Sequence, residues 1–291
     1  FVCFNTEGRA CLEMLSPMCR LAFFTPLCHL IVSGQLEYTQ YYPSCIGSVV
    51  IVTGASSGIG ASASIMFSKE GAHVVMVGRN ENKLAAVAAK CSSPLVVRAD
   101  VANDDDARRI IDQTINKFGQ IDVLVNNAGL SVENGGILGN DMMKAFDTVI
   151  NVNLRAVVHL TILAAPYLVK TKGNIVNISS IAGIMPPFGP GMTNYYVSKA
   201  GLNHFTVSAA TELSPLGVRV NTISPGPVRT DFMENAKSAF TWDNFPPLTL
   251  LNRVSEPEEV ADLILYMASD RANLLFRFVR PVSKKKHETH R

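Results

Sequence analysis

The chain has 291 residues, of which 47% are hydrophobic and 17% charged, so it can bury a sizeable core and is not disordered by composition. Its formal net charge of +2 is unevenly distributed, because residues 277–291 hold six Lys or Arg against one Glu. This pattern excludes the broad basic surface that nucleic-acid binding needs, and it confines any contact with a polyanion to the C-terminal tail.

The cysteines separate a leader from the body of the chain. Five of the six precede residue 46, and only Cys91 follows. The body is therefore predicted to be cytoplasmic, free of disulfides and without a metal site. In the leader, residues 1–45, the apolar run Leu21–Val32 is too short to span a bilayer but could serve as a secretory signal, so targeting is left open and no stable membrane span is expected.

The rest of the chain is organised around the stretch Val49–Gly60. Its first four residues are β-branched, as expected of a strand that is buried on both faces of a parallel sheet. Gly54, Gly58 and Gly60 follow, and glycines let the backbone turn sharply and approach a pyrophosphate at the start of a helix. We interpret the stretch as a nucleotide-binding turn; an ordinary strand-to-helix turn is the alternative.

Strand and helix patterns alternate after this turn. Such alternation predicts an α/β fold, a single doubly wound Rossmann-type parallel sheet flanked by helices, in domain 46–270. The expected strands are 73–77, 95–98, 121–125, 174–178 and 219–223. The expected helices are 61–70, 82–91, about 104–118, 142–169 and 195–213.

In such sheets ligands bind beyond the carboxyl ends of the strands. The second strand ends at Gly78–Arg79, about 25 residues after Gly54, where an NAD-binding sheet usually offers an acidic residue. An arginine can instead bind a 2′-phosphate, which favours NADP, with NAD still possible. A solvated surface arginine is the alternative. Asp100 follows the third strand and could equally cap the next helix.

The fifth strand leads to Ser180, and Tyr195 and Lys199 follow fifteen and nineteen residues later. Four residues apart on a helix, the tyrosine and the lysine share one face. The Tyr-x3-Lys pair by itself is common, but its position at the start of a helix after a strand-end serine is much rarer.

Taken together, these motifs resemble the short-chain dehydrogenase/reductase family over about Val49–Asp270. The matching residues are Thr53–Gly60, Asn126–Gly129, Asn153, Ser180, Tyr195 with Lys199, and Pro225–Gly226 with Thr230. The body is most similar to 3-oxoacyl-carrier-protein reductases and to sugar or steroid alcohol dehydrogenases.

The resemblance implies hydride transfer between a nicotinamide and a secondary alcohol or ketone, most simply NADPH-dependent carbonyl reduction. It implies four catalytic residues: Tyr195 as the acid or base, Lys199 lowering its pKa towards neutrality, Ser180 orienting the carbonyl, and Asn153 holding a water. The cofactor residues it implies are Thr53, Gly54, Ser56, Ser57, Gly58, Ile59, Gly60, Arg79, Asp100, Val101, Asn127, Ala128, Gly129, Tyr195, Lys199, Pro225, Gly226, Val228 and Thr230.

Two further expectations concern the lid and the oligomeric state. Residues 232–251, with Met233, Phe240, Trp242 and Phe245, are interpreted as a lid over an apolar substrate, with a plain surface helix and loop as the alternative. The resemblance also implies a homodimer or homotetramer, paired through helices 142–169 and 195–213.

The C-terminus departs from the family pattern, because residues 271–291 form a divergent basic tail in which only 275–279 could supply the usual last strand. This departure motivates one alternative function, a catalytically inactive cofactor-binding or scaffold protein. The lysines 284–286 motivate another, a nucleic-acid or membrane-surface binder, although a short basic run more often only solvates a tail.

Overall fold

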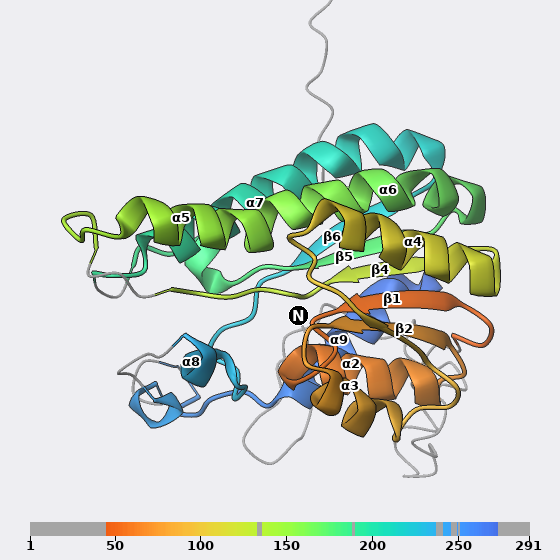
Figure 1. The fold of residues 1–291 in the computed structure, drawn as a ribbon, viewed down its shortest axis with the longest axis horizontal. Helices are drawn as coiled ribbons and strands as arrows, with labels where there is room; N and C mark the ends of the chain where they lie inside the picture. Colours follow the sequence, from red (N-terminus) through yellow and green to blue (C-terminus); the bar gives the residue numbers. More distant parts are fainter. Residues whose placement is uncertain are drawn as a thin grey trace, which may run out of the picture. The chain divides into compact units, whose positions relative to one another are not determined.

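The computed structural model describes residues 45–132, 136–187, 190–236, 241–245, 249 and 251–272 (Figure 1). The described residues all belong to one unit of the chain, which begins at Pro43. The leader before Cys45, the lid residue Phe240, the possible last strand at 275–279 and the basic tail from residue 273 onward lie outside the described residues.

Six parallel strands form the sheet, in the order β3-β2-β1-β4-β5-β6. The strands are β1 (Val49–Thr53), β2 (His73–Gly78), β3 (Leu95–Arg98), β4 (Val123–Asn126), β5 (Asn174–Ile178) and β6 (Arg219–Ile223). The chain winds outward from β1 in one direction and from β4 in the other, so the strand order reverses between these two neighbours. The predicted doubly wound α/β fold is confirmed.

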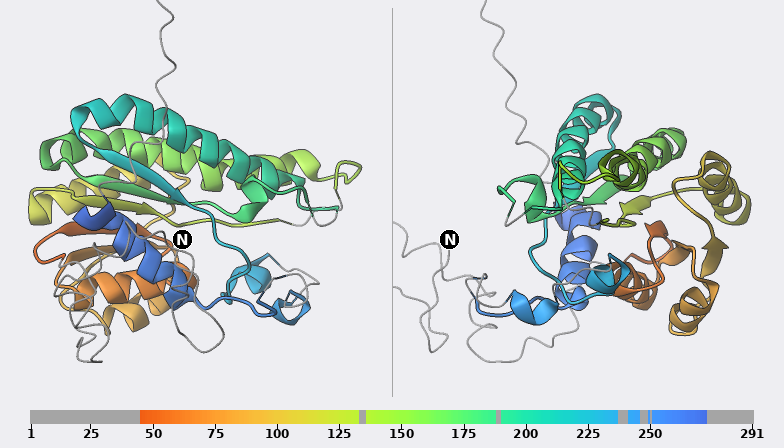
Figure 2. Two further views of the ribbon diagram at one scale, coloured as in Figure 1. Left: turned by 180° about the vertical axis from the view of Figure 1, so that it is seen from behind. Right: turned by 60° about the vertical axis from the view of Figure 1, so that its left-hand side comes forward.

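Helices cover both faces of this sheet, as the views in Figures 1 and 2 show. The helices are α2 (Gly58–Lys69), α3 (Glu81–Ala88), α4 (Asp104–Phe118), α5 (Met142–Ile150), α6 (Ala156–Thr171), α7 (Thr193–Leu213), the short α8 (Phe232–Asn235) and α9 (Pro257–Ala268). Short 3₁₀ turns occupy Ile181–Gly183, Ser214–Leu216 and Trp242–Asn244, and a π turn occupies Asn151–Arg155.

The alternation of side chains along β1 builds the core on both faces. Val50 and Val52 pack in a cluster with Phe67 of α2 and Ile264 of α9. Ile51, one residue on, belongs instead to the opposite cluster, with residues of α4, α6 and α7. Because both faces are buried, the strand is apolar at every position, and this is why the sequence pattern was continuous rather than alternating.

The expected helix at 142–169 consists of three parts, since the π turn at Asn151–Arg155 separates α5 from α6. Among the described residues, Met142–Thr171 is the one helical stretch long and apolar enough to cross a membrane by length and composition. Leu160, Ala164 and Leu168 of this stretch are buried in the core cluster on the sheet. Packing within the domain therefore accounts for the apolar side chains on this buried side of the stretch.

Candidate active site

The glycine-rich turn lies between the carboxyl end of β1 and the start of α2. Gly54 and Gly58 have φ of +68° and +52°, values that favour glycine over residues with a side chain. At Gly60 the constraint is space, because an added Cβ would lie 2.3 Å from the carbonyl oxygen of Gly54. Each of the three predicted glycines is thus required by the local backbone.

Thr53 joins this turn to the next strand. Its hydroxyl oxygen accepts hydrogen bonds from the backbone N–H groups of Asn127 (2.9 Å) and Ala128 (3.0 Å). The side-chain amide of Asn127 donates in return to the Thr53 carbonyl at 2.9 Å. These bonds fix the ends of β1 and β4 to each other at the point where the strand order reverses.

A cleft of about 350 Å³ opens at this point. The start of α2 faces it, and the N-cap residue Ser57 makes no side-chain capping bond. The first N–H groups of α2 therefore lack the usual side-chain acceptor, a local arrangement that suits an anion such as a diphosphate. Most of the predicted site residues line the cleft: Gly54, Ser56, Ser57, Gly58, Ile59, Arg79, Asp100, Val101, Asn127, Ala128, Gly129, Ser180, Tyr195, Lys199, Pro225, Gly226, Val228 and Thr230.

Three predicted residues do not line it. Thr53 and Gly60 support the turn from behind, as described above, and Asn153 is fully buried. The Asn153 side chain accepts a hydrogen bond from the Leu130 N–H (2.9 Å) and donates to the Leu130 carbonyl (2.8 Å). It also donates to the Ser198 hydroxyl at 3.1 Å. Both amide hydrogens are thereby used, so this side chain holds the loop after β4 in place.

Arg79 and Asp100 lie at one end of the cleft, after β2 and β3. The arginine is 69% exposed, and its nearest carboxylate oxygen, on Asp100, is 3.8 Å away. An exposed pair at this distance contributes little, so the guanidinium is available to a ligand. The alternative prediction, that Asp100 caps the following helix, is wrong. The cap of α4 is Asn103, whose side chain accepts hydrogen bonds from the N–H groups of Asp105 and Asp106.

Ser180, Tyr195 and Lys199 come together at the other end of the cleft. Ser180 follows β5 and accepts a hydrogen bond from the Ala182 N–H (3.1 Å), while its side chain is also hydrogen-bonded to Tyr195. Lys199 is 4% exposed, and its ammonium donates to the Ile178 carbonyl at 2.9 Å and lies 5.6 Å from the centre of the Tyr195 ring. The sequence spacing is therefore realised as one cluster of polar groups.

Burial shifts the pKa values of Tyr195 and Lys199, and the shift of Tyr195 is opposite to the expected one. Desolvation raises the pKa of Tyr195 to about 12, against a smaller lowering by the hydrogen bond with Ser180. Desolvation also lowers the pKa of Lys199 to about 8. The expected lowering of the tyrosine pKa towards neutrality by Lys199 is therefore not seen, because desolvation outweighs the one lowering cause, the hydrogen bond with Ser180.

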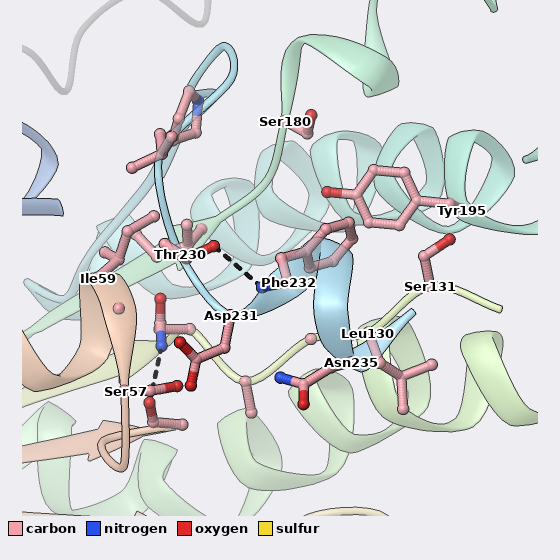
Figure 3. A pocket seen from close by; sticks show the side chains of 18 of the residues that line it. Ser57, Ile59, Leu130, Ser131, Ser180, Tyr195, Thr230, Asp231, Phe232 and Asn235 are labelled. Atoms are coloured by element: carbon pink, nitrogen blue, oxygen red, sulfur yellow. Dashed lines mark hydrogen bonds between the residues drawn. The ribbon is translucent and has the colours of Figure 1, made fainter. Parts of the chain in front are cut away.

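The segment after β6 forms the opposite wall of the cleft. The ring of Phe232 lies 5.3 Å from that of Tyr195, and the Trp242 indole donates to the Thr230 carbonyl at 2.7 Å. Figure 3 shows Phe232 and Thr230 on this wall, facing Tyr195 and Ile59. Of the expected lid residues, Met233, Trp242 and Phe245 line the cleft.

Several lining residues were missed by the sequence analysis: Leu130, Ser131, Val152, Ser179, Ile181, Met192, Tyr196 and Asp231. Two of them, Leu130 and Ser131, directly follow the predicted Asn126–Gly129 motif, and Tyr196 follows Tyr195. Adjacency to a motif was the available signal, but it does not tell which side chain faces the cleft.

A doubly wound parallel sheet with a glycine-rich turn and a cleft at its reversal point defines a Rossmann-type dinucleotide-binding protein. The sequence model of the short chain dehydrogenase family matches residues 48–240. This chain therefore belongs to the short-chain dehydrogenase family of oxidoreductases.

Relatives and solved structures agree with this assignment. The 3-oxoacyl-[acyl-carrier-protein] reductase of Thermotoga maritima is 36% identical over 234 residues, covering 78% of this chain and 92% of the relative. A (+)-borneol dehydrogenase of Salvia officinalis is 34% identical over 255 residues, covering 82% and 89%. A Caenorhabditis elegans short-chain dehydrogenase/reductase of unknown function, solved with cofactor, has a TM-score of 0.75 at 33% identity, covering 81% of this chain and 92% of that one.

A fourth comparison is with the 3-ketoacyl-(acyl-carrier-protein) reductase of Brucella melitensis complexed with NADH. It has a TM-score of 0.73 at 27% identity and covers 79% of this chain and 94% of that one. Of these four proteins, two are named for a ketoacyl-carrier-protein substrate, one is named for borneol, and the Caenorhabditis elegans protein carries no substrate name.

Proposed function

We propose that this protein is an NADPH-dependent carbonyl reductase that interconverts an apolar ketone and its secondary alcohol. The observation that carries the proposal is the cluster of Ser180, Tyr195 and Lys199 at one end of the cleft, with a glycine-rich turn and Arg79 at the other. A nicotinamide cofactor, when bound, supplies or accepts the hydride. Every other task falls to side chains of this chain.

Tyr195 transfers the proton to or from the substrate oxygen. With a pKa raised to about 12, its hydroxyl keeps its proton at neutral pH and can donate it to a carbonyl oxygen that gains negative charge. Ser180, hydrogen-bonded to Tyr195, orients the same oxygen. The ammonium of Lys199 stabilises the tyrosinate that remains. Asn153 acts through Leu130 and Ser198, and any water it holds must use its remaining acceptor positions.

The preference for NADP rests on Arg79. Its guanidinium is exposed at the end of the cleft beyond β2, and a charge-assisted hydrogen bond to a 2′-phosphate contributes ~1.5–3 kcal/mol. We therefore expect kcat/KM to be roughly ten- to a hundredfold higher with NADPH than with NADH. A preference for NADH would remove Arg79 from this role.

An apolar substrate is supported by the wall of Phe232, Met233, Trp242 and Phe245 opposite Tyr195. The names of the relatives span an acyl-carrier substrate and a bicyclic terpene alcohol, so they support a ketone or secondary alcohol without choosing between these classes. A screen of NADPH oxidation over ketones of graded size would identify the preferred class.

The decisive variant is Tyr195→Phe, with Tyr196→Phe as a control that removes the neighbouring hydroxyl in the same cleft. We expect the first to lose about 10²–10⁴-fold in turnover while NADPH binding, followed by its fluorescence, stays within about twofold, because proton transfer is lost and the phosphate contacts are kept. Cofactor binding without turnover by the unmodified chain on any ketone would instead favour the inactive cofactor-binding alternative.

A further inference from the structure

Ser131 is a buried serine whose hydroxyl has no hydrogen-bond partner within the part of the chain that the structure describes. It is 4% exposed, and its Oγ belongs to the small set of buried side-chain atoms without a hydrogen bond among the described residues. The others in that set are on Asn126, His159, Thr161, Asn174, Asn203 and Asn221, and none of these residues lines the cleft. Ser131 does line it, so its unsatisfied hydroxyl belongs to the candidate active site.

The position of Ser131 is fixed by the residue before it. Both backbone polar groups of Leu130 are hydrogen-bonded to the buried side chain of Asn153, at 2.9 and 2.8 Å. Figure 3 shows Ser131 beside Tyr195, at the far end of the cleft from Ser57 and the glycine-rich turn. A ligand group that reaches Ser131 must therefore lie on the substrate side of the cluster.

The neighbouring hydroxyls are already engaged, since Ser180 accepts from the Ala182 N–H and is hydrogen-bonded to Tyr195. The Ser131 hydroxyl can both donate and accept. Leaving such a group buried without a hydrogen bond costs free energy. We therefore expect a bound ligand to supply the hydrogen-bond partner of the Ser131 hydroxyl.

We propose that Ser131 binds a second polar atom of the substrate, so that the preferred substrates are ketones bearing another hydrogen-bonding oxygen near the reacting carbonyl. This inference rests on the proposed carbonyl reductase function. Ser131 then selects among apolar ketones by a contact that is separate from proton transfer at Tyr195.

The test compares Ser131→Ala and Ser131→Thr on two ketones of equal chain length, a 3-oxo ester and an unsubstituted ketone. For Ser131→Ala we expect kcat/KM on the 3-oxo ester to fall ~3- to 10-fold, mainly through KM, and to change less than about twofold on the plain ketone. Ser131→Thr keeps a hydroxyl and should recover part of the loss. Ser57→Ala, at the opposite end of the cleft, should affect both ketones equally.

Equal losses on the two ketones, or no loss on either, would overturn the role of Ser131. A second readout is the thermal midpoint of the free protein, which Ser131→Ala should leave unchanged or raise, because the variant removes an unpaired buried hydroxyl. A clear fall would show that the hydroxyl has a structural partner, and this too would overturn the proposal.

If the unmodified chain turns over no ketone, the proposed function is wrong, but the contact at Ser131 can still be tested by ligand binding. In that test the 3-oxo ester, added with NADPH, should raise the thermal midpoint of the unmodified protein more than that of Ser131→Ala. Equal shifts in the two proteins, or no shift in either, would reject the contact.

Discussion

Lys199 shows how a functional side chain can oppose the stability of the fold that carries it. It is 4% exposed, and its ammonium donates to the Ile178 carbonyl; no carboxylate is among the causes of its pKa shift. Desolvation of the charged form is the cause that lowers its pKa from 10.5 to about 8. The folded chain at neutral pH therefore holds a charge that it would be more stable without, as is common at sites built for chemistry.

We predict that Lys199→Met stabilises the protein at pH 7 by about 1–3 kcal/mol while turnover is lost, because methionine fills the site without a buried charge. Between pH 8 and 10.5 the lysine binds more protons in the unfolded chain than in the folded one. The free energy of unfolding of the unmodified chain therefore rises with pH in this window, and the advantage of the variant becomes smaller.

Urea unfolding of both proteins at pH 7, 8 and 9.5 measures this difference. Lys170→Met, on the helix α6 and outside the cleft, serves as the control and should shift stability little. A variant less stable than the unmodified chain at pH 7 would contradict the prediction.

The segment from Arg229 to α8 acts as an element that closes one side of the cleft. It contacts the glycine-rich turn, since a Cβ on Gly58 would lie 2.7 Å from the Thr230 side chain. It is also joined to α3 by an ion pair of Lys83 and Asp231, 2.5 Å between nitrogen and oxygen. Thr230, Asp231 and Phe232 of this segment line the cleft in which we propose that the cofactor binds, so we expect the ion pair to slow release of the cofactor.

We predict that Asp231→Asn raises the dissociation rate of NADPH. The paired side chains are 51% and 34% exposed, and such pairs contribute ~0.2–1 kcal/mol, so the rate should increase by roughly 1.5- to 5-fold. Salt screens exposed pairs, so the difference from the unmodified chain should shrink at ~1 M salt.

Stopped-flow displacement of NADPH measures this rate. Asp105→Asn removes the carboxylate of another exposed ion pair, with Arg108 on α4, and should leave the rate unchanged. A similar change in both variants would remove the special role of the pair at the cleft.

At the scale of the whole molecule, α6 and α7 lie side by side on one face of the sheet, as Figures 1 and 2 show. Their outer surfaces carry apolar side chains, with Ile162 63% and Val207 50% exposed. Single exposed apolar residues are ordinary, but these two lie on the helices through which the family resemblance implies pairing. The homodimer or homotetramer thus remains a prediction, and the outer surface of α6 and α7 is the interface that it predicts.

We predict that Ile162→Glu combined with Val207→Glu lowers the oligomeric state, because two copies of each carboxylate would be desolvated in a symmetric interface. Light scattering after size-exclusion chromatography measures the mass. Ile46→Glu, at an exposed residue outside both helices, is the control and should keep the mass of the unmodified chain. An unchanged mass in the double variant, with its circular dichroism preserved, would place any interface elsewhere.

The sequence by itself determined the sheet, because parallel strands buried on both faces must be apolar throughout and the helices between them must be amphipathic. The strands β3, β5 and β6 begin and end where their patterns predict. Family membership was also readable, since motifs such as Thr53–Gly60 and Tyr195 with Lys199 depend on local backbone geometry and helical spacing.

Only the tertiary structure decided how distant segments meet. Lys83 and Asp231 are 148 residues apart, and no local pattern predicts their contact. The π turn that aims Asn153 at Leu130, the placement of Phe232 against Tyr195 and the unpaired hydroxyl of Ser131 likewise follow from packing between elements. The raised pKa of Tyr195 has the same origin: spacing brings a lysine near a tyrosine, but the amount of water removed from both depends on the whole surrounding fold.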